Sequence, residues 1–149
     1  MAQSAGHIVP PTDRLLHATA VACDGNAVLL TGPSGSGKSA IALQLLALGA
    51  DLISDDQTAL SRSGDALLAT PAPNISGRIE AYGIGILRAS VVRRAQVTLV
   101  ANLGIVETDR LPPWRTTDLL GVRLPCLHKV EDSHFPAAIL QYLRHGRSD

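Results

Sequence analysis

One octapeptide constrains this chain more than any other part of its sequence. Positions 32–39 match the pattern G-x-x-x-x-G-K-[ST], and in order they are Gly32, Pro33, Ser34, Gly35, Ser36, Gly37, Lys38 and Ser39. Glycines in such a loop let consecutive backbone N–H groups turn inward around phosphate oxygens. The lysine then reaches the terminal phosphates, and the serine hydroxyl can ligate Mg²⁺. A chance match in a chain of this length is on the order of 1 in 200, so the octapeptide predicts a phosphate-binding loop.

The sequence on both sides of the octapeptide supports this prediction. An apolar run at 27–31 precedes it and is typical of a strand. Apolar residues then recur at roughly helical spacing over 39–48, with Gly49 as a C-terminal cap. A helix that starts near Lys38 directs its positive end toward bound phosphates. The loop alone is equally compatible with an ATPase, a kinase or a molecular switch.

Turn signals and apolar runs predict a mixed set of strands around this unit. The runs at 15–23 and 27–31 flank Asp24-Gly25-Asn26 and are expected to form a hairpin, and those at 57–62 and 66–70 a second one. In chain order, the other expected elements are a strand at 51–55, an apolar segment of undecided type at 84–92, a buried strand at 97–103, an edge strand at 122–130 that holds Pro125, and a helix over 135–143. The pattern indicates an α/β or α+β class.

Length and composition predict a single cytoplasmic domain. The 149 residues suggest a leader at 1–13, one domain over 14–145 and a tail at 146–149. A formal net charge of +0 gives no general attraction to nucleic acid or to an anionic membrane, and no apolar run is long enough to span a bilayer. Cys23 and Cys126 lack the spacing of a metal site and are typical of reduced thiols in the cytosol.

Two adjacent acids and one histidine are candidates for the chemistry. Asp55 and Asp56 end the strand expected after the loop's helix. Because parallel strands end at one edge of a sheet, these carboxylates are expected near the phosphates, one to hold Mg²⁺ and the other to accept a proton. His17, on the first strand of the predicted hairpin, could hydrogen-bond an aspartate. A solvated acidic turn and an ordinary strand histidine are the alternatives.

Four segments together resemble the catalytic domain of bacterial HPr kinase/phosphorylase. In chain order they are LHATAV at 16–21, the octapeptide at 32–39, LISDD at 52–56 and IEAYGIGI at 79–86. The likeness covers roughly 14–144. It implies an α/β fold with the P-loop core that this family shares with phosphoenolpyruvate carboxykinase, and assembly into hexamers. It also implies ATP- and Mg²⁺-dependent phosphorylation of a serine on HPr, the phosphocarrier of the phosphotransferase system, which many members reverse by phosphorolysis to pyrophosphate.

The resemblance also implies a role for each candidate. Asp56 would be the general base of the kinase reaction and the general acid of its reversal. Asp55 and Ser39 would lie at the metal, Lys38 would bind phosphate, and His17 would tune the acidic pair. The resemblance thus assigns the metal-binding and proton-accepting roles, which the residues alone do not assign.

The last of these segments bears on the partner, and the chain departs from the family pattern in four places. The resemblance implies that Glu80 and Gly83 lie near the partner serine, although a lone G-x-G is also typical of a turn or bulge. Tyr82 stands where the family usually has arginine, the stretch at 84–97 is shorter, and EDSHFP at 131–136 replaces a basic loop. The chain also lacks room for the family's N-terminal domain, so a short form with altered regulation is expected.

Three functions therefore remain to be distinguished. The first is an HPr serine kinase, with or without the reverse phosphorolysis. The second is a nucleotide-binding regulatory module that binds a partner without efficient phosphate transfer, as the missing basic loop suggests. The third is a small-molecule kinase with the same loop and acids, although the arginine-bearing lid typical of such enzymes is not evident.

Overall fold

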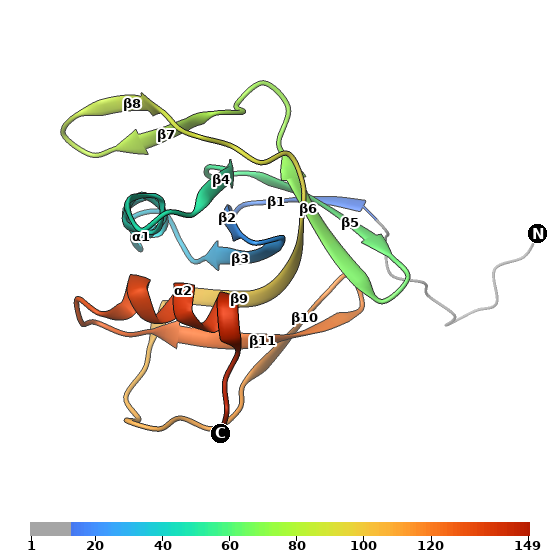
Figure 1. Ribbon diagram of the computed structural model, residues 1–149, viewed down its shortest axis with the longest axis vertical. Helices are drawn as coiled ribbons and strands as arrows, with labels where there is room; N and C mark the ends of the chain where they lie inside the picture. Colours follow the sequence, from blue (N-terminus) through green and yellow to red (C-terminus); the bar gives the residue numbers. More distant parts are fainter. Residues whose placement is uncertain (1–12) are drawn as a thin grey trace, which may run out of the picture.

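The computed structural model describes residues 13–149 (Figure 1). The strands are β1 Asp13–Leu16, β2 Thr19–Cys23, β3 Asn26–Thr31, β4 Asp51–Ser54, β5 Thr58–Ser63, β6 Ala66–Pro71, β7 Arg78–Ala81, β8 Gly85–Arg88, β9 Ala95–Val106, β10 Thr116–Leu119 and β11 Val122–Lys129. The helices are α1 Lys38–Ala47 and α2 Phe135–His145. The expected leader lies outside the described residues, except that Asp13 already belongs to β1.

Nine of these strands form one mixed sheet. Its order is β1-β5-β6-β9-β3-β2-β4, with β11 beside β9 and β10 beside β11. The pairs β3–β9 and β9–β11 are parallel, and the other pairs are antiparallel. Strands β7 and β8 form a separate hairpin that lies over α1 (Figure 1). The α/β class with hairpins around a strand–loop–helix unit is confirmed.

Alternate residues of the central strands face two hydrophobic cores. On β3, Val28 faces the core in which Leu45 of α1 and Ile139 of α2 are buried, so both helices cover one side of the sheet (Figure 1). The next residue, Leu29, faces the second core, where Leu67 of β6 lies. This alternation is the two-residue period of an extended strand. Burial on both faces fixes the position of β3, which leads directly into the loop at 32–37.

The predicted hairpins form where local turn chemistry allows them. Asp24 and Gly25 take positive φ values of 53° and 83°, as a two-residue hairpin turn requires, and they join β2 to β3. Strands β5 and β6 also form an antiparallel hairpin, across a turn at 64–65. The predicted helices at 39–48 and 135–143 correspond to α1 and α2.

Two expected strands differ from the observed ones, and the structure decides the segment of undecided type. The run at 15–23 breaks at residues 17–18, because β1 pairs with β5 whereas β2 pairs with β3 and β4. The expected edge strand, β11, instead has two neighbours: its first half pairs with β10 and its second half with β9, with Pro125 opposite Thr116. The apolar segment at 84–92 contributes β8 and then continues without regular structure, apart from one bridge between Val91 and Leu52.

The strand order brings the ends of two separate strands to one edge of the sheet. Strand β2 lies between β3 and β4 and is antiparallel to both, so β3 and β4 run in the same direction. Their carboxyl ends and the beginning of β2 therefore lie together. The loop at 32–37, the acids after β4 and Thr19 of β2 meet at this edge.

Candidate active site

The loop between β3 and α1 depends on its glycines. Gly32, Gly35 and Gly37 have φ values of 136°, 84° and 103°, which side chains of L-residues rarely allow. A Cβ atom on Gly32 would lie 2.7 Å from Ser36 Oγ and 3.1 Å from the backbone nitrogen of Gly104. The turn at Gly32 thus needs glycine for both conformation and space.

The first turn of α1 leaves backbone donors free beside this loop. Hydrogen bonding from the loop into the helix begins when the Ile41 N–H donates to Gly37 O at 3.0 Å. The N–H groups of residues 38–40, in the first turn, have no acceptor within the helix. Together with the positive end of the helix, these donors form an environment suited to an anion.

Two lysines hold the loop in its curved shape. Lys38 is buried, and its Nζ donates to the carbonyl oxygens of Gly32 at 2.8 Å and of Pro33 at 3.2 Å. Lys129, at the end of β11, donates from Nζ to Ser36 O at 3.0 Å. The analysis of the sequence missed Lys129, because 93 residues separate it from Ser36.

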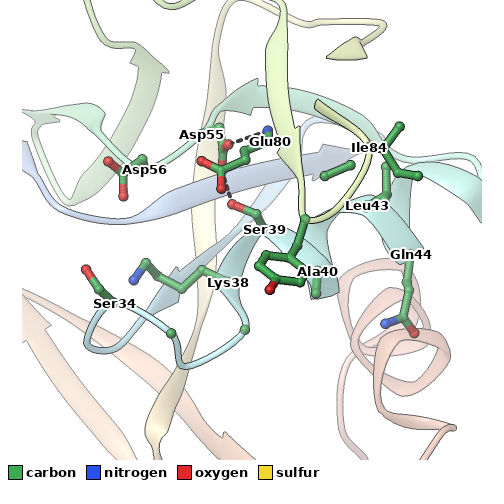
Figure 2. Close-up of a pocket in the computed structure, with 14 residues that line it drawn as sticks. Ser34, Lys38, Ser39, Ala40, Leu43, Gln44, Asp55, Asp56, Glu80 and Ile84 are labelled. Carbon is green, nitrogen blue, oxygen red and sulfur yellow. Dashed lines mark hydrogen bonds between the residues drawn. The ribbon is translucent and has the colours of Figure 1, made fainter. Parts of the chain in front are cut away.

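Asp55 is a buried carboxylate held by three hydrogen bonds. Ser39 Oγ donates to its Oδ1 at 2.7 Å, Thr19 Oγ1 donates to the same oxygen at 3.0 Å, and the backbone N–H of Glu80 donates to Oδ2 at 3.0 Å. Figure 2 shows Ser39 and the Glu80 backbone converging on it. The carboxylate is consequently fixed within reach of the loop's serine hydroxyl.

Ser39 and Asp55 have the chemistry of a magnesium site. A hydroxyl oxygen and a carboxylate oxygen, 2.7 Å apart, are hard ligands of the kind that Mg²⁺ prefers. Within residues 13–149, no group of three or more His, Cys, Asp or Glu side chains is arranged to hold a metal. A Mg²⁺ ion held by this pair would take its remaining ligands from phosphate oxygens and water.

Asp56 occupies a different environment from its neighbour. Its side chain is 64% exposed, and Oδ1 lies 3.4 Å from His17 Nε2. Its backbone has a positive φ of 69°, and its N–H donates to Thr19 Oγ1 at 3.0 Å. The hydroxyl of Thr19 thus contacts both acids, and it supports a backbone conformation that is uncommon outside glycine. Thr19 was also missed by the sequence reasoning, although it lies within the segment at 16–21 that carried the resemblance.

Two clefts meet at the acidic pair. The larger has a volume of about 780 Å³, and its lining residues are Ser34, Gly35, Gly37, Lys38, Ser39, Ala40, Leu43, Gln44, Asp55, Asp56, Glu80, Ala81, Tyr82 and Ile84 (Figure 2). The smaller, of about 330 Å³, shares Asp55, Asp56 and Glu80 with it. Both acids therefore line two neighbouring clefts.

Of the two residues expected near the partner serine, Glu80 lines the clefts and Gly83 does not. Glu80 lines both clefts, and its backbone N–H donates a hydrogen bond to Asp55 Oδ2. Gly83 lies in the turn between β7 and β8 with a φ of 83°, and an added Cβ would meet nothing within 4 Å. The turn conformation explains this glycine, and it lines neither of the two clefts.

A separate ion pair fixes the segment after β9. Arg115 donates from Nε and Nη2 to the two carboxylate oxygens of Glu107, each at 3.0 Å. This bidentate contact lowers the pKa of Glu107 to about 2. His128 Nδ1 lies 4.0 Å from the same carboxylate. The tail at 146–149 also contacts this segment, since the Arg147 guanidinium lies 4.5 Å from the centre of the Trp114 ring.

The fold and this site define a mixed α/β domain in which a glycine-rich strand–loop–helix unit faces a pair of acids. The family model of the HPr Serine kinase C-terminal domain matches residues 11–127. The chain belongs to this family, and the resemblance stated from the sequence is confirmed. Among residues 13–149, neither helix has the length and apolar character needed to cross a bilayer.

Similar proteins carry the corresponding names. The HPr kinase/phosphorylase of Aromatoleum aromaticum is 34% identical over 121 residues, covering 72% of this chain and 39% of the relative. HPr kinase/phosphorylase 1 of Oceanobacillus iheyensis is 31% identical over 141 residues, covering 89% and 43%. The solved structure of the Hpr(Ser) kinase/phosphatase from Coxiella burnetii matches with a TM-score of 0.74 and 26% identity, covering 88% of this chain and 94% of that one. The chain spans about two fifths of the length of these curated relatives.

Proposed function

We propose that this chain transfers the γ-phosphoryl group of MgATP to a serine of HPr. The observation that carries the proposal is that two adjacent acids beside the loop at 32–37 differ in burial and in their contacts. Asp55 is buried and bound to Ser39, whereas Asp56 is exposed to the cleft beside His17. Membership in the HPr serine kinase family supports HPr as the acceptor.

The loop would bind the phosphates of ATP. The free N–H groups at 38–40 and the Lys38 ammonium supply positive charge where the β- and γ-phosphates would lie. Ser39 and Asp55 would hold the Mg²⁺ that enters with the nucleotide and neutralises charge on the transferring group. In this role the Asp55 carboxylate would stay fixed in position by its three hydrogen bonds.

Asp56 would accept the proton of the acceptor hydroxyl. The serine oxygen forms its bond to the γ-phosphorus, the bond from that phosphorus to the β–γ bridging oxygen breaks, and ADP leaves. His17, 3.4 Å from Asp56, would orient this carboxylate by hydrogen bonding. In the reverse reaction an oxygen of inorganic phosphate would form a bond to the phosphorus of phosphoserine, and the bond from that phosphorus to the serine oxygen would break. Pyrophosphate is the product, and Asp56 would donate its proton to the serine oxygen.

The acceptor would approach from the smaller cleft. Asp56, Glu80 and Arg78 line this cleft, and its lining includes no residue of α1. Glu80 would thus lie near the acceptor serine, with the turn at Gly83 farther along the same hairpin. We further propose that 14–145 act as one catalytic domain in the cytoplasm, and that the chain forms an oligomer.

Transfer to HPr is the direct test. The protein is incubated with ATP, Mg²⁺ and purified HPr, and phosphoserine is detected by mass. Asp56→Asn should abolish transfer while retaining ATP binding, because the amide cannot take up the proton. Asp118→Asn is the matched control, since Asp118 is an exposed acid on β10 whose nearest charged partner is Arg123.

Other outcomes would point to the alternatives. ATP binding without transfer to HPr would indicate a regulatory module. Transfer to a small hydroxyl compound in place of HPr would indicate a small-molecule kinase. Adding inorganic phosphate to phosphorylated HPr tests reversal, and absence of pyrophosphate would mark a kinase without phosphorolysis.

A further inference from the structure

The larger cleft extends beyond the residues that phosphates would need. Ala40, Leu43 and Gln44 line it along α1, past the loop and the acids (Figure 2). Their spacing of three and four residues places them on one face of the helix. This face combines a small residue next to the loop, an apolar surface at Leu43 and an exposed amide at Gln44.

The hairpin β7–β8 supplies the opposite wall. Tyr82 and Ile84 line the same cleft, and they are 99% and 76% exposed. Exposed side chains of this size across from an apolar helix face form a slot that is open to a flat, partly apolar ligand. The hairpin lies over α1 (Figure 1), so the slot continues directly from the loop.

The order of the phosphate-binding groups along α1 indicates which part of a bound nucleotide would lie in the slot. Ala40 carries the last free N–H of the first turn of α1, beyond Lys38 and Ser39. If the terminal phosphates lie at Lys38 and Ser39, the phosphate at Ala40 is the one that carries the ribose. The next group along α1 is then the nucleoside.

We propose that the slot between α1 and the β7–β8 hairpin binds the nucleoside of the donor nucleotide and selects adenine. Tyr82 stacks on the base, Leu43 contacts its other apolar surface, and the Gln44 amide pairs with N6 and N7. An amide offers one donor and one acceptor, which match adenine, whereas guanine presents two acceptors at the corresponding edge. This inference rests on the proposed function, because it takes the phosphates to lie in the loop.

Binding measurements with three ligands test the slot. Affinities for ATP, GTP and inorganic tripolyphosphate are measured by calorimetry with Mg²⁺. Tyr82→Ala should weaken ATP binding at least about fivefold, the size expected from loss of base stacking, and leave tripolyphosphate binding unchanged. Tyr82→Phe keeps the ring and should bind ATP as the wild type does.

Gln44 reports on base selection. Gln44→Ala should reduce the preference for ATP over GTP at least about fivefold without changing the affinity for tripolyphosphate. Leu48→Ala is the matched control at the C-terminal cap of the same helix, because Leu48 is 46% exposed and lines neither cleft. It should leave all three affinities unchanged.

Separate results would refute the slot and the proposed function. If ATP and tripolyphosphate bind the wild type equally tightly and Tyr82→Ala changes neither, the nucleoside lies elsewhere although the phosphate site stands. If Tyr82→Ala raises only the KM for HPr, the hairpin contacts the acceptor and the slot is wrong. If the wild type binds neither ATP nor tripolyphosphate, the proposed function itself fails.

Discussion

Removing the Thr19 hydroxyl should disturb both acids at once. This side chain is fully buried, and its oxygen donates to Asp55 Oδ1 and accepts from the Asp56 N–H, each at 3.0 Å. Thr19→Val is close in shape and suits a β-strand, so the backbone of β2 should be retained. The variant loses a hydrogen bond to a carboxylate and leaves a partly buried N–H without its partner.

The expected loss of stability follows from those two contacts. A hydrogen bond to a charged group is worth about 1.5–3 kcal/mol, and an unpaired buried donor costs about 1–3 kcal/mol. Because the two effects share one oxygen and are not additive, we expect the free energy of unfolding to fall by about 2–4 kcal/mol. Urea unfolding followed by circular dichroism measures this change, and Thr19→Ser, which keeps the hydroxyl, should recover most of it.

Activity should fall further than stability alone explains. With Asp56 released from its left-handed backbone conformation, we expect kcat for HPr phosphorylation to fall by about 10²-fold, as misplacement of a reacting group by about 1 Å can cause. Thr58→Val is the matched control, because Thr58 is also fully buried and donates at 2.9 Å to Ala18 O without touching either acid.

The control variant defines the result that would refute this reasoning. Thr58→Val should lower the free energy of unfolding by about 1 kcal/mol and leave kcat close to that of the wild type. If Thr19→Val and Thr58→Val affect kcat equally, the bridging hydroxyl does not position the acids. An unfolding free energy unchanged in Thr19→Val would show that neither hydrogen bond contributes as the distances indicate.

Two further predictions concern the loop and the segment after β9. Lys38→Ala should weaken binding of ATP and of tripolyphosphate alike, because both ligands would contact the Lys38 ammonium. Calorimetry measures both affinities, and equal values for the wild type and the variant would contradict this prediction. Glu107 has a pKa lowered from 4.5 to about 2, so its ion pair with Arg115 stabilises the fold above pH 4.5 and is lost as the pH falls toward 2. The difference in unfolding free energy between wild type and Glu107→Gln should therefore shrink over this range, and a constant difference would argue against it.

The elements that the sequence predicted are those set by nearby residues. Positive φ values at Asp24 and Gly25 close the β2–β3 turn, and a glycine-rich loop followed by helical periodicity yields α1. Such signals act within a few positions of the chain, so they are visible before any tertiary contact is known. The family likeness rests on the same segments and needed no coordinates.

The sequence predicted the position of the acids beside the loop, but it did so from a sheet arrangement simpler than the observed one. The sequence argument placed Asp55 and Asp56 near the loop because neighbouring parallel strands end together. In the structure an antiparallel strand, β2, lies between β3 and β4, and these two strands still end at the same edge. The inserted strand also brings Thr19 between the acids, a contact that the simpler arrangement would not contain.

By itself, then, the sequence determined the loop, its helix, the hairpin turns and the presence of an acidic pair, because each depends on backbone conformations set locally. Only the tertiary structure decided that the run at 15–23 breaks beside His17, that Lys129 holds Ser36 across 93 positions, and that the hairpin carrying Tyr82 lies over α1. These contacts depend on which strands pair and which faces are buried. Pairing partners are chosen by burial over the whole sheet, and no short stretch of sequence specifies them.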